Sequence, residues 1–115
     1  MTGLQIEKRQ AADVTILDLH GDITIGDGGR MLDAEIKNLV EQGTGNILIN
    51  LAKVIYVDSC GLGHMISGYQ EVKQVGGKLK LLNLTQRVRD LMVITKLLTV
   101  FDAYDDEADA LSSYH

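Results

Sequence analysis

The chain has 115 residues, of which 45% are apolar, and it carries a formal net charge of −5. This length and composition predict a single globular domain over residues 1–115 with one core. The apolar runs fall short of the roughly 18 residues that a membrane-spanning helix requires, and the N-terminus lacks the apolar stretch of a signal peptide. We therefore expect a cytoplasmic protein with no membrane partner.

The excess of negative charge lies at the C-terminal end. Residues 1–100 hold eleven basic and eleven acidic side chains, whereas the remaining acids have no Lys or Arg among them: Asp102, Asp105, Asp106, Glu107 and Asp109. An acidic surface repels phosphates, so nucleic acid is not expected as a direct partner. These acids fit either the first turn of a helix, which the helix dipole favours, or a docking surface for a basic partner.

The N-terminal part predicts a β-hairpin followed by a helix. Residues 4–8 alternate with period two and residues 14–19 continue as a second strand, with a turn at 11–13. Gly21 and Asp22 are expected to break this strand before residues 23–25, and residues 26–29 form a loop or the start of a helix. Apolar residues at helical spacing then predict a helix that ends near Gly43, with an inner face of Met31, Leu32, Ile36, Leu39 and Val40.

The rest of the chain alternates strands with helices. Residues 46–51 read as a strand that is covered on both faces, and residues 54–57 lead on from it. We expect a helix from about residue 60 to 75, a strand at 78–82, a helix capped by Thr85, a short strand at 100–101 and a final helix at 105–113. This order predicts an α/β fold with a mixed sheet of four or five strands, right-handed crossovers and about four helices.

The candidate site is the segment Val57-Asp58-Ser59-Cys60-Gly61-Leu62-Gly63. It joins an apolar strand to a stretch of helical periodicity, so Ser59 is expected at or just before a helix N-terminus, where free N–H groups and the helix dipole favour an anion. Ser59 is then either a phosphate acceptor or a plain helix cap, and Asp58 either caps the helix or orients a kinase. Gly61 and Gly63 indicate either close approach of a partner backbone or tight packing of the helix on the sheet.

The sequence predicts neither a cofactor nor a metal site. Cys60 is the only cysteine, so it forms no internal disulfide and no zinc site by itself, and His20, His64 and His115 are too dispersed to share a metal. The glycines at 26–29 lack the Lys-Ser/Thr of a phosphate-binding loop. Cys60 and His64 could form a reactive pair in a hydrolase or redox enzyme, but no third orienting group is legible, and a small packing residue is the simpler interpretation of Cys60.

In their order along the chain, these features resemble the STAS domain family, and within it the bacterial anti-sigma factor antagonists. The resemblance extends from about Leu4 to Ala110, through the strand pair, Gly21-Asp22-Ile23, the Asp58-Ser59 motif and the Gly76-Gly77 helix stop. In that family the motif commonly reads Asp-Ser-Ser-Gly-Leu-Gly, and its first serine is phosphorylated. The resemblance thus implies phosphorylation of Ser59, with Cys60 in place of the second serine. The segment that it implies contacts a partner comprises Asp22, Asp58, Ser59, Cys60, Gly61, Leu62 and Gly63.

The resemblance also implies a partner switch. The unphosphorylated chain would bind an anti-sigma factor serine kinase and so free a sigma factor, the phosphorylated chain would be released, and a PP2C-type phosphatase would reset the switch. Two alternatives remain open. One is a STAS scaffold subunit of a signalling complex that does not act on a sigma factor. The other is a receiver-like domain phosphorylated on Asp58, which would need an acidic pair after its first strand, where only Asp13 lies nearby.

Overall fold

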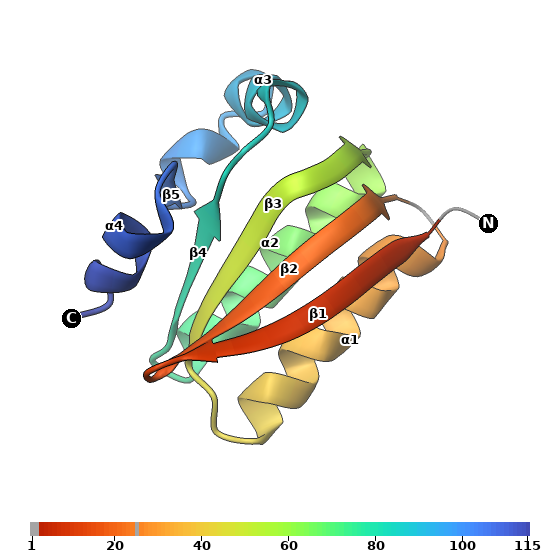
Figure 1. Ribbon diagram of the computed structural model, residues 1–115. Helices are drawn as coiled ribbons and strands as arrows, with labels where there is room; N and C mark the ends of the chain where they lie inside the picture. The colour runs from red at the N-terminus through yellow and green to blue at the C-terminus, as the bar shows by residue number, and fades with distance from the viewer. Residues whose placement is uncertain (1–2, 25) are drawn as a thin grey trace.

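Five strands form one mixed sheet in the computed structural model, which describes residues 3–24 and 26–115. The sheet order equals the chain order, with an antiparallel pair at one edge and parallel neighbours thereafter (Figure 1). The strands are β1 (Leu4–Ala11), β2 (Val14–Ile23), β3 (Asn46–Val57), β4 (Lys78–Leu82) and β5 (Ala103–Tyr104). The predicted α/β fold with a mixed sheet is confirmed.

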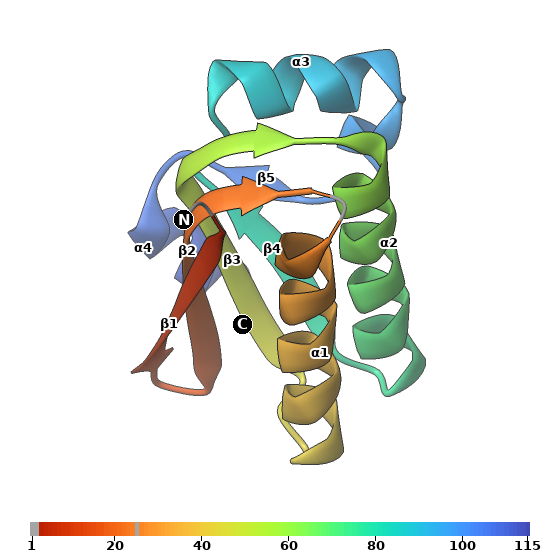
Figure 2. The same cartoon turned by 90° about the vertical axis from the view of Figure 1, so that its right-hand side faces the viewer.

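Two helices, α1 (Asp27–Glu41) and α2 (Ser59–Gln74), lie side by side on one face of the sheet (Figure 2). Between them and the sheet is the main core, to which β2, β3 and β4 contribute the fully buried side chains of Leu17, Ile49 and Leu81. The helices approach closely because α2 has a glycine at the contact. A Cβ atom on Gly68 would stand 2.6 Å from Cδ1 of Ile36.

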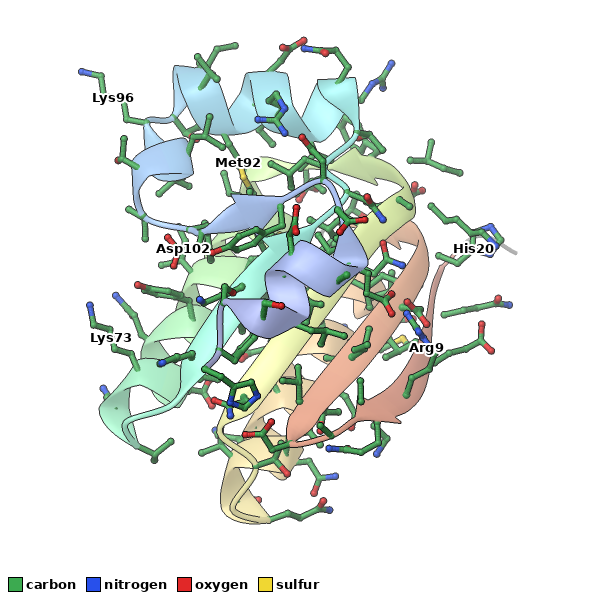
Figure 3. The ribbon with its side chains drawn as sticks, turned by 60° about the vertical axis from the view of Figure 1, so that its left-hand side comes forward. Arg9, His20, Lys73, Met92, Lys96 and Asp102 are labelled. Carbon is green, nitrogen blue, oxygen red and sulfur yellow. The ribbon has the colours of Figure 1, made fainter. Side chains whose placement is uncertain are left out.

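The short helix α4 (Glu107–Ser112) covers part of the opposite face (Figure 3). It seals a second, smaller apolar cluster to which Leu48 and Leu82 contribute from the sheet. The buried Lys80 fastens this helix, because its ammonium donates hydrogen bonds to the carbonyl oxygen and to Oγ of Ser113, at 3.0 and 2.9 Å, and lies over the ring of Tyr114. The ammonium is thus provided with acceptors, as a buried charge requires.

Helix α3 (Gln86–Ile94), followed by the 3₁₀ turn η1 (Leu97–Thr99), lies across the end of the sheet where β3 finishes (Figures 1 and 2). Its predicted cap is confirmed, since Oγ1 of Thr85 accepts a hydrogen bond from the Val88 N–H at 3.3 Å. Met92 is fully buried beneath α3, whereas Lys96 extends away from the molecule at its far end (Figure 3).

Two strand predictions are wrong. β2 does not break at Gly21 and Asp22 but runs to Ile23. Gly21 adopts a φ of 121°, and the β2–β3 register shifts there, so the glycine accommodates an irregularity inside the strand. The strand expected at 100–101 is absent, because Phe101 is a core residue packed edge-on against Tyr69; the strand β5 lies two residues later.

The predicted inner face of α1 is wrong at one position. Met31 is 42% exposed, whereas Leu32, Ile36 and Leu39 are buried. The final helix also starts at Glu107 rather than at 105, because Asp106 serves as its cap by accepting a hydrogen bond from the Asp109 N–H at 3.0 Å. Each helix within the described part of the chain is too short or too polar to cross a bilayer.

Candidate functional site

The candidate site lies where the parallel strands β2 and β3 end and helix α2 begins. Ile23 and Val57 are the last paired residues of the two strands, and the Asp58 N–H donates a hydrogen bond to the Ile23 carbonyl oxygen at 3.3 Å. Figure 2 shows the N-terminal ends of α1 and α2 together at this end of the sheet. The carboxyl ends of parallel strands are a frequent location of binding sites in α/β folds.

Asp58 is the N-terminal cap of α2. Its backbone is extended, and its Oδ1 accepts a hydrogen bond from the Gly61 N–H at 2.7 Å while its carbonyl oxygen accepts one from the Leu62 N–H at 2.9 Å. The carboxylate therefore satisfies one of the free donors of the first turn and complements the helix dipole. A phosphoacceptor on Asp58, as in the receiver-like alternative, would have to give up this cap.

Ser59 is the first residue of α2, and it is exposed. Since Asp58 caps the helix, the interpretation of Ser59 as a plain cap is wrong. Its hydroxyl has a solvent-facing position at the positive end of a 16-residue helix. A negative charge added there would interact favourably with the dipole and with the remaining free N–H groups of the first turn.

The next residues of the motif divide into buried and exposed positions. Leu62 is 4% exposed and belongs to the core, and a Cβ atom on Gly61 would overlap the Ile23 carbonyl oxygen, so both positions hold α2 against the sheet. By contrast, Gly63 is exposed and a Cβ atom there would meet nothing within 4 Å. Tight packing is thus the reason for Gly61, whereas it does not account for Gly63.

Cys60 is an exposed free thiol beside Ser59, so its interpretation as a small packing residue is wrong. The Nδ1 atom of His64 lies 3.3 Å from Oδ2 of Asp33 on helix α1, so the imidazole has an orienting carboxylate that the sequence did not reveal. The imidazole packs against Gly29, where a Cβ atom would stand 2.5 Å from its Cδ2. In the described part of the chain, no three His, Cys, Asp or Glu side chains converge as metal ligands would.

Asp22, the remaining predicted contact residue, lies one position before the end of β2 and pairs in register with Tyr56 of β3. It is half-buried, and its carbonyl oxygen lies so close to Gly28 that a Cβ atom there would overlap it. The structure thus brings Asp22 to the same end of the sheet as Asp58 and Ser59.

Sequence reasoning missed several exposed side chains around this end of the sheet. Ile55 and Tyr56, in the last part of β3, are 66% and 44% exposed, and the guanidinium of Arg87 on α3 lies 5.9 Å from the centre of the Tyr56 ring. The sequence indicates only that residues 54–57 lead on from the covered strand at 46–51, and it does not predict that Ile55 and Tyr56 are exposed. These positions lie in the part of β3 that extends beyond its pairing with β4, and the sequence pattern does not predict this extension.

The seam between α1 and α2 holds a carboxyl pair below the site. Burial raises the pKa of Glu71 above its ordinary value, and the neighbouring carboxyl of Asp33 raises it further. Oδ1 of Asp33 is buried and accepts no hydrogen bond from a described donor.

Comparison with known proteins gives a consistent result. A model of the STAS domain family matches residues 5–110. The anti-sigma-B factor antagonist of Bacillus subtilis (strain 168) is 32% identical over 99 residues, which cover 86% of this chain and 89% of that protein. The anti-sigma F factor antagonist of Paenibacillus polymyxa is 29% identical over 112 residues, covering 95% and 93%. The structure of the Bacillus cell fate determinant SpoIIAA in the phosphorylated form matches with a TM-score of 0.75 at 19% identity, covering 96% of this chain and 100% of that one, which shows a common fold.

Proposed function

This chain belongs to the STAS domain family, and from that premise we propose that it is an anti-sigma factor antagonist controlled by phosphorylation of Ser59. It acts by binding rather than by catalysis, in the cytoplasm. Its unphosphorylated form sequesters an anti-sigma factor that is also a serine kinase, and a sigma factor is freed as a result. The proposal is supported most directly by the exposed position of Ser59 on the first turn of a helix that another residue caps.

The position of Ser59 makes phosphorylation compatible with the fold. Its side chain is exposed, so a phosphate displaces no packed atoms, and Asp58 continues to cap the helix through the Gly61 N–H. A phosphoserine adds about −1.5 to −2 charge at neutral pH, which is favourable at a helix N-terminus. The phosphorylated and unphosphorylated chains therefore have the same fold, and the switch acts at the surface.

The surface around Ser59 explains how a phosphate would weaken binding. The kinase has to hold the terminal phosphate of its nucleotide close to the Ser59 hydroxyl, so after transfer the new dianion faces the phosphates of the remaining nucleotide. Asp58 lies next to it and adds to the local negative charge. A 100-fold loss of affinity requires only about 2.7 kcal/mol, which desolvation and like-charge repulsion at such a contact supply.

Cys60 sits beside the acceptor, exposed in the partner-facing segment. A cysteine there keeps a small side chain, so the kinase approaches Ser59 as it would approach it beside a second serine. A PP2C-type phosphatase removes the phosphate and restores binding, and it requires the same accessibility of the Ser59 phosphate.

Phosphosite mapping tests this proposal. The purified chain is incubated with ATP and the anti-sigma serine kinase encoded in the same genome, and its intact mass is measured before peptide mapping. We expect a gain of one phosphoryl group, about 80 Da, on Ser59. The Ser59→Ala variant should gain none, while Ser112→Ala, which alters an exposed serine on the remote helix α4, should react like the wild type. Phosphate that persists in Ser59→Ala, or that maps to Asp58, contradicts the proposal.

A further inference from the structure

A hollow of about 500 Å³ opens at the same end of the sheet as Ser59. Its walls come from the start of β1, the end of β2, the first two turns of α1 and the last part of β3. The apolar side chains in it are Leu4, which is 4% exposed, and Met31 and Ile55, which are 42% and 66% exposed. Ile55 precedes Ser59 by four residues, so their Cα atoms lie no more than about 14 Å apart, and one partner can reach both the hollow and the acceptor.

The charged side chains that line the hollow are acidic. Asp22 and Asp27 contribute carboxylates and His20 contributes an imidazole, and none of the lining residues is Lys or Arg. Arg30 reaches Asp27 only at 3.4 Å, and no described side chain pairs with the Asp22 carboxylate. Such a rim repels the phosphates of a nucleotide and attracts a cation.

We propose that this hollow is a second contact for the anti-sigma partner, and that it takes an aliphatic side chain which the partner carries beside a Lys or Arg. This inference rests on the function proposed above and names a part of the same partner surface. The aliphatic side chain covers Met31 and Ile55, and the cation meets Asp22. Burial of exposed apolar side chains supplies affinity, and the charge pair sets the orientation of the partner.

A second copy of this chain fits the hollow less well than such a partner. A twofold interface would bring the same surface of both copies together, and Asp22 and Asp27 of one copy would face those of the other. The whole chain also carries a net charge of −5. A partner with a basic side chain at this point turns the same carboxylates into attractive contacts.

A contact away from the reacting hydroxyl changes how tightly the partner holds the chain rather than how fast phosphate is transferred. It should therefore affect the KM of Ser59 phosphorylation and leave kcat unchanged. This split separates the hollow from Ser59 itself, whose replacement abolishes the reaction.

The test compares Ile55→Ser and Met31→Ser with Val75→Ser. Val75 is 59% exposed but lies at the C-terminal end of α2, far along the helix from Ser59, so it controls for loss of an exposed apolar side chain. Affinity for the purified kinase is measured by titration calorimetry, and KM and kcat by phosphate transfer from ATP. We expect Ile55→Ser and Met31→Ser each to weaken binding and raise KM by about tenfold, with Val75→Ser within about twofold of the wild type. Asp22→Asn should weaken binding and flatten its dependence on salt.

The failures of the two proposals are distinguishable. If the wild type binds the kinase and Ile55→Ser binds it equally well, the hollow is not a contact, although the proposed function stands. If the wild type neither binds nor is phosphorylated, the proposed function fails and the hollow loses its partner with it. A wild-type dimer that Ile55→Ser dissociates, seen by sedimentation, would overturn the inference in favour of a second copy. Thermal melts of the same samples establish that each variant is folded.

Discussion

Replacing Asp58 tests whether this side chain serves the fold as the cap of α2. In Asp58→Ala the Gly61 N–H loses the acceptor that now lies 2.7 Å away, and the helix N-terminus loses a favourable negative charge. Loss of a cap costs about 1 kcal/mol, and loss of the charge at the helix end about 0.5 kcal/mol more. The sum of about 1.5 kcal/mol corresponds to a decrease in Tm of roughly 6 °C for a domain of this size.

Asp58→Asn is the matched variant, because its amide oxygen can still accept the hydrogen bond of Gly61 while the charge is removed. We expect it to lie within about 0.5 kcal/mol of the wild type. Urea denaturation followed by circular dichroism measures both variants. An Ala variant as stable as the wild type, or an Asn variant as unstable as the Ala variant, would refute the assignment of Asp58 as a hydrogen-bonding cap.

Three further changes test the packing and the electrostatics. Gly61→Ala forces a Cβ atom into the Ile23 carbonyl oxygen and should cost about 3 kcal/mol in urea denaturation, which a loss below 1 kcal/mol would contradict. The hydrogen bond from Arg9 lowers the pKa of Asp18, so the stability that this pair contributes is present at neutral pH and is lost as pH falls through the lowered pKa. Arg9→Met should therefore lower the free energy of unfolding by about 1 kcal/mol at pH 7 and leave it unchanged in acid. An equal loss at both pH values would contradict this. The raised pKa of Glu71 has the opposite effect on the pH dependence of stability, because the folded state keeps a proton that the unfolded state releases above pH 4.5. The stability of the fold should therefore decrease as pH rises from 4.5 through the raised pKa of Glu71. In thermal melts at pH 7, Glu71→Gln should have a higher Tm than the wild type. An equal or lower Tm would contradict this prediction.

The order of the elements could be predicted because local patterns agree with the fold. Strands and helices alternate along the chain, and signals such as Thr85 before α3 have direct structural counterparts in hydrogen bonds. The exceptions depend on contacts between distant segments. Gly21 resembles a strand break, but it pairs with Leu4 of β1 and therefore stays within β2. A glycine is needed there because a Cβ atom would overlap the Gly3 carbonyl oxygen. Phe101 has the β-propensity of a strand residue, but its contact with Tyr69 determines its place in the core.

The position of the candidate site along the chain could be predicted from the sequence, but the surface that surrounds it could not. The motif predicts Ser59 at the start of α2, and the structure confirms this. The sequence could not decide between Ser59 and Asp58 as the cap, which is settled by the hydrogen bond that Oδ1 of Asp58 accepts from the Gly61 N–H. Met31 has helical spacing that matches the inner face of α1, yet it is exposed because it lies near the end of the helix, beside the hollow. Such end effects are not visible in the periodicity of a sequence.

The affinity of the anti-sigma kinase for this chain before and after phosphorylation of Ser59 tests the central claim most directly. Titration calorimetry compares the unphosphorylated chain with the chain phosphorylated on Ser59, with Ser59→Ala and Ser59→Asp as variants that bind constitutively and weakly. We predict that phosphorylation weakens binding about 100-fold, equivalent to about 2.7 kcal/mol, while circular dichroism shows an unchanged fold. Equal affinities of the phosphorylated and unphosphorylated chains would contradict the account.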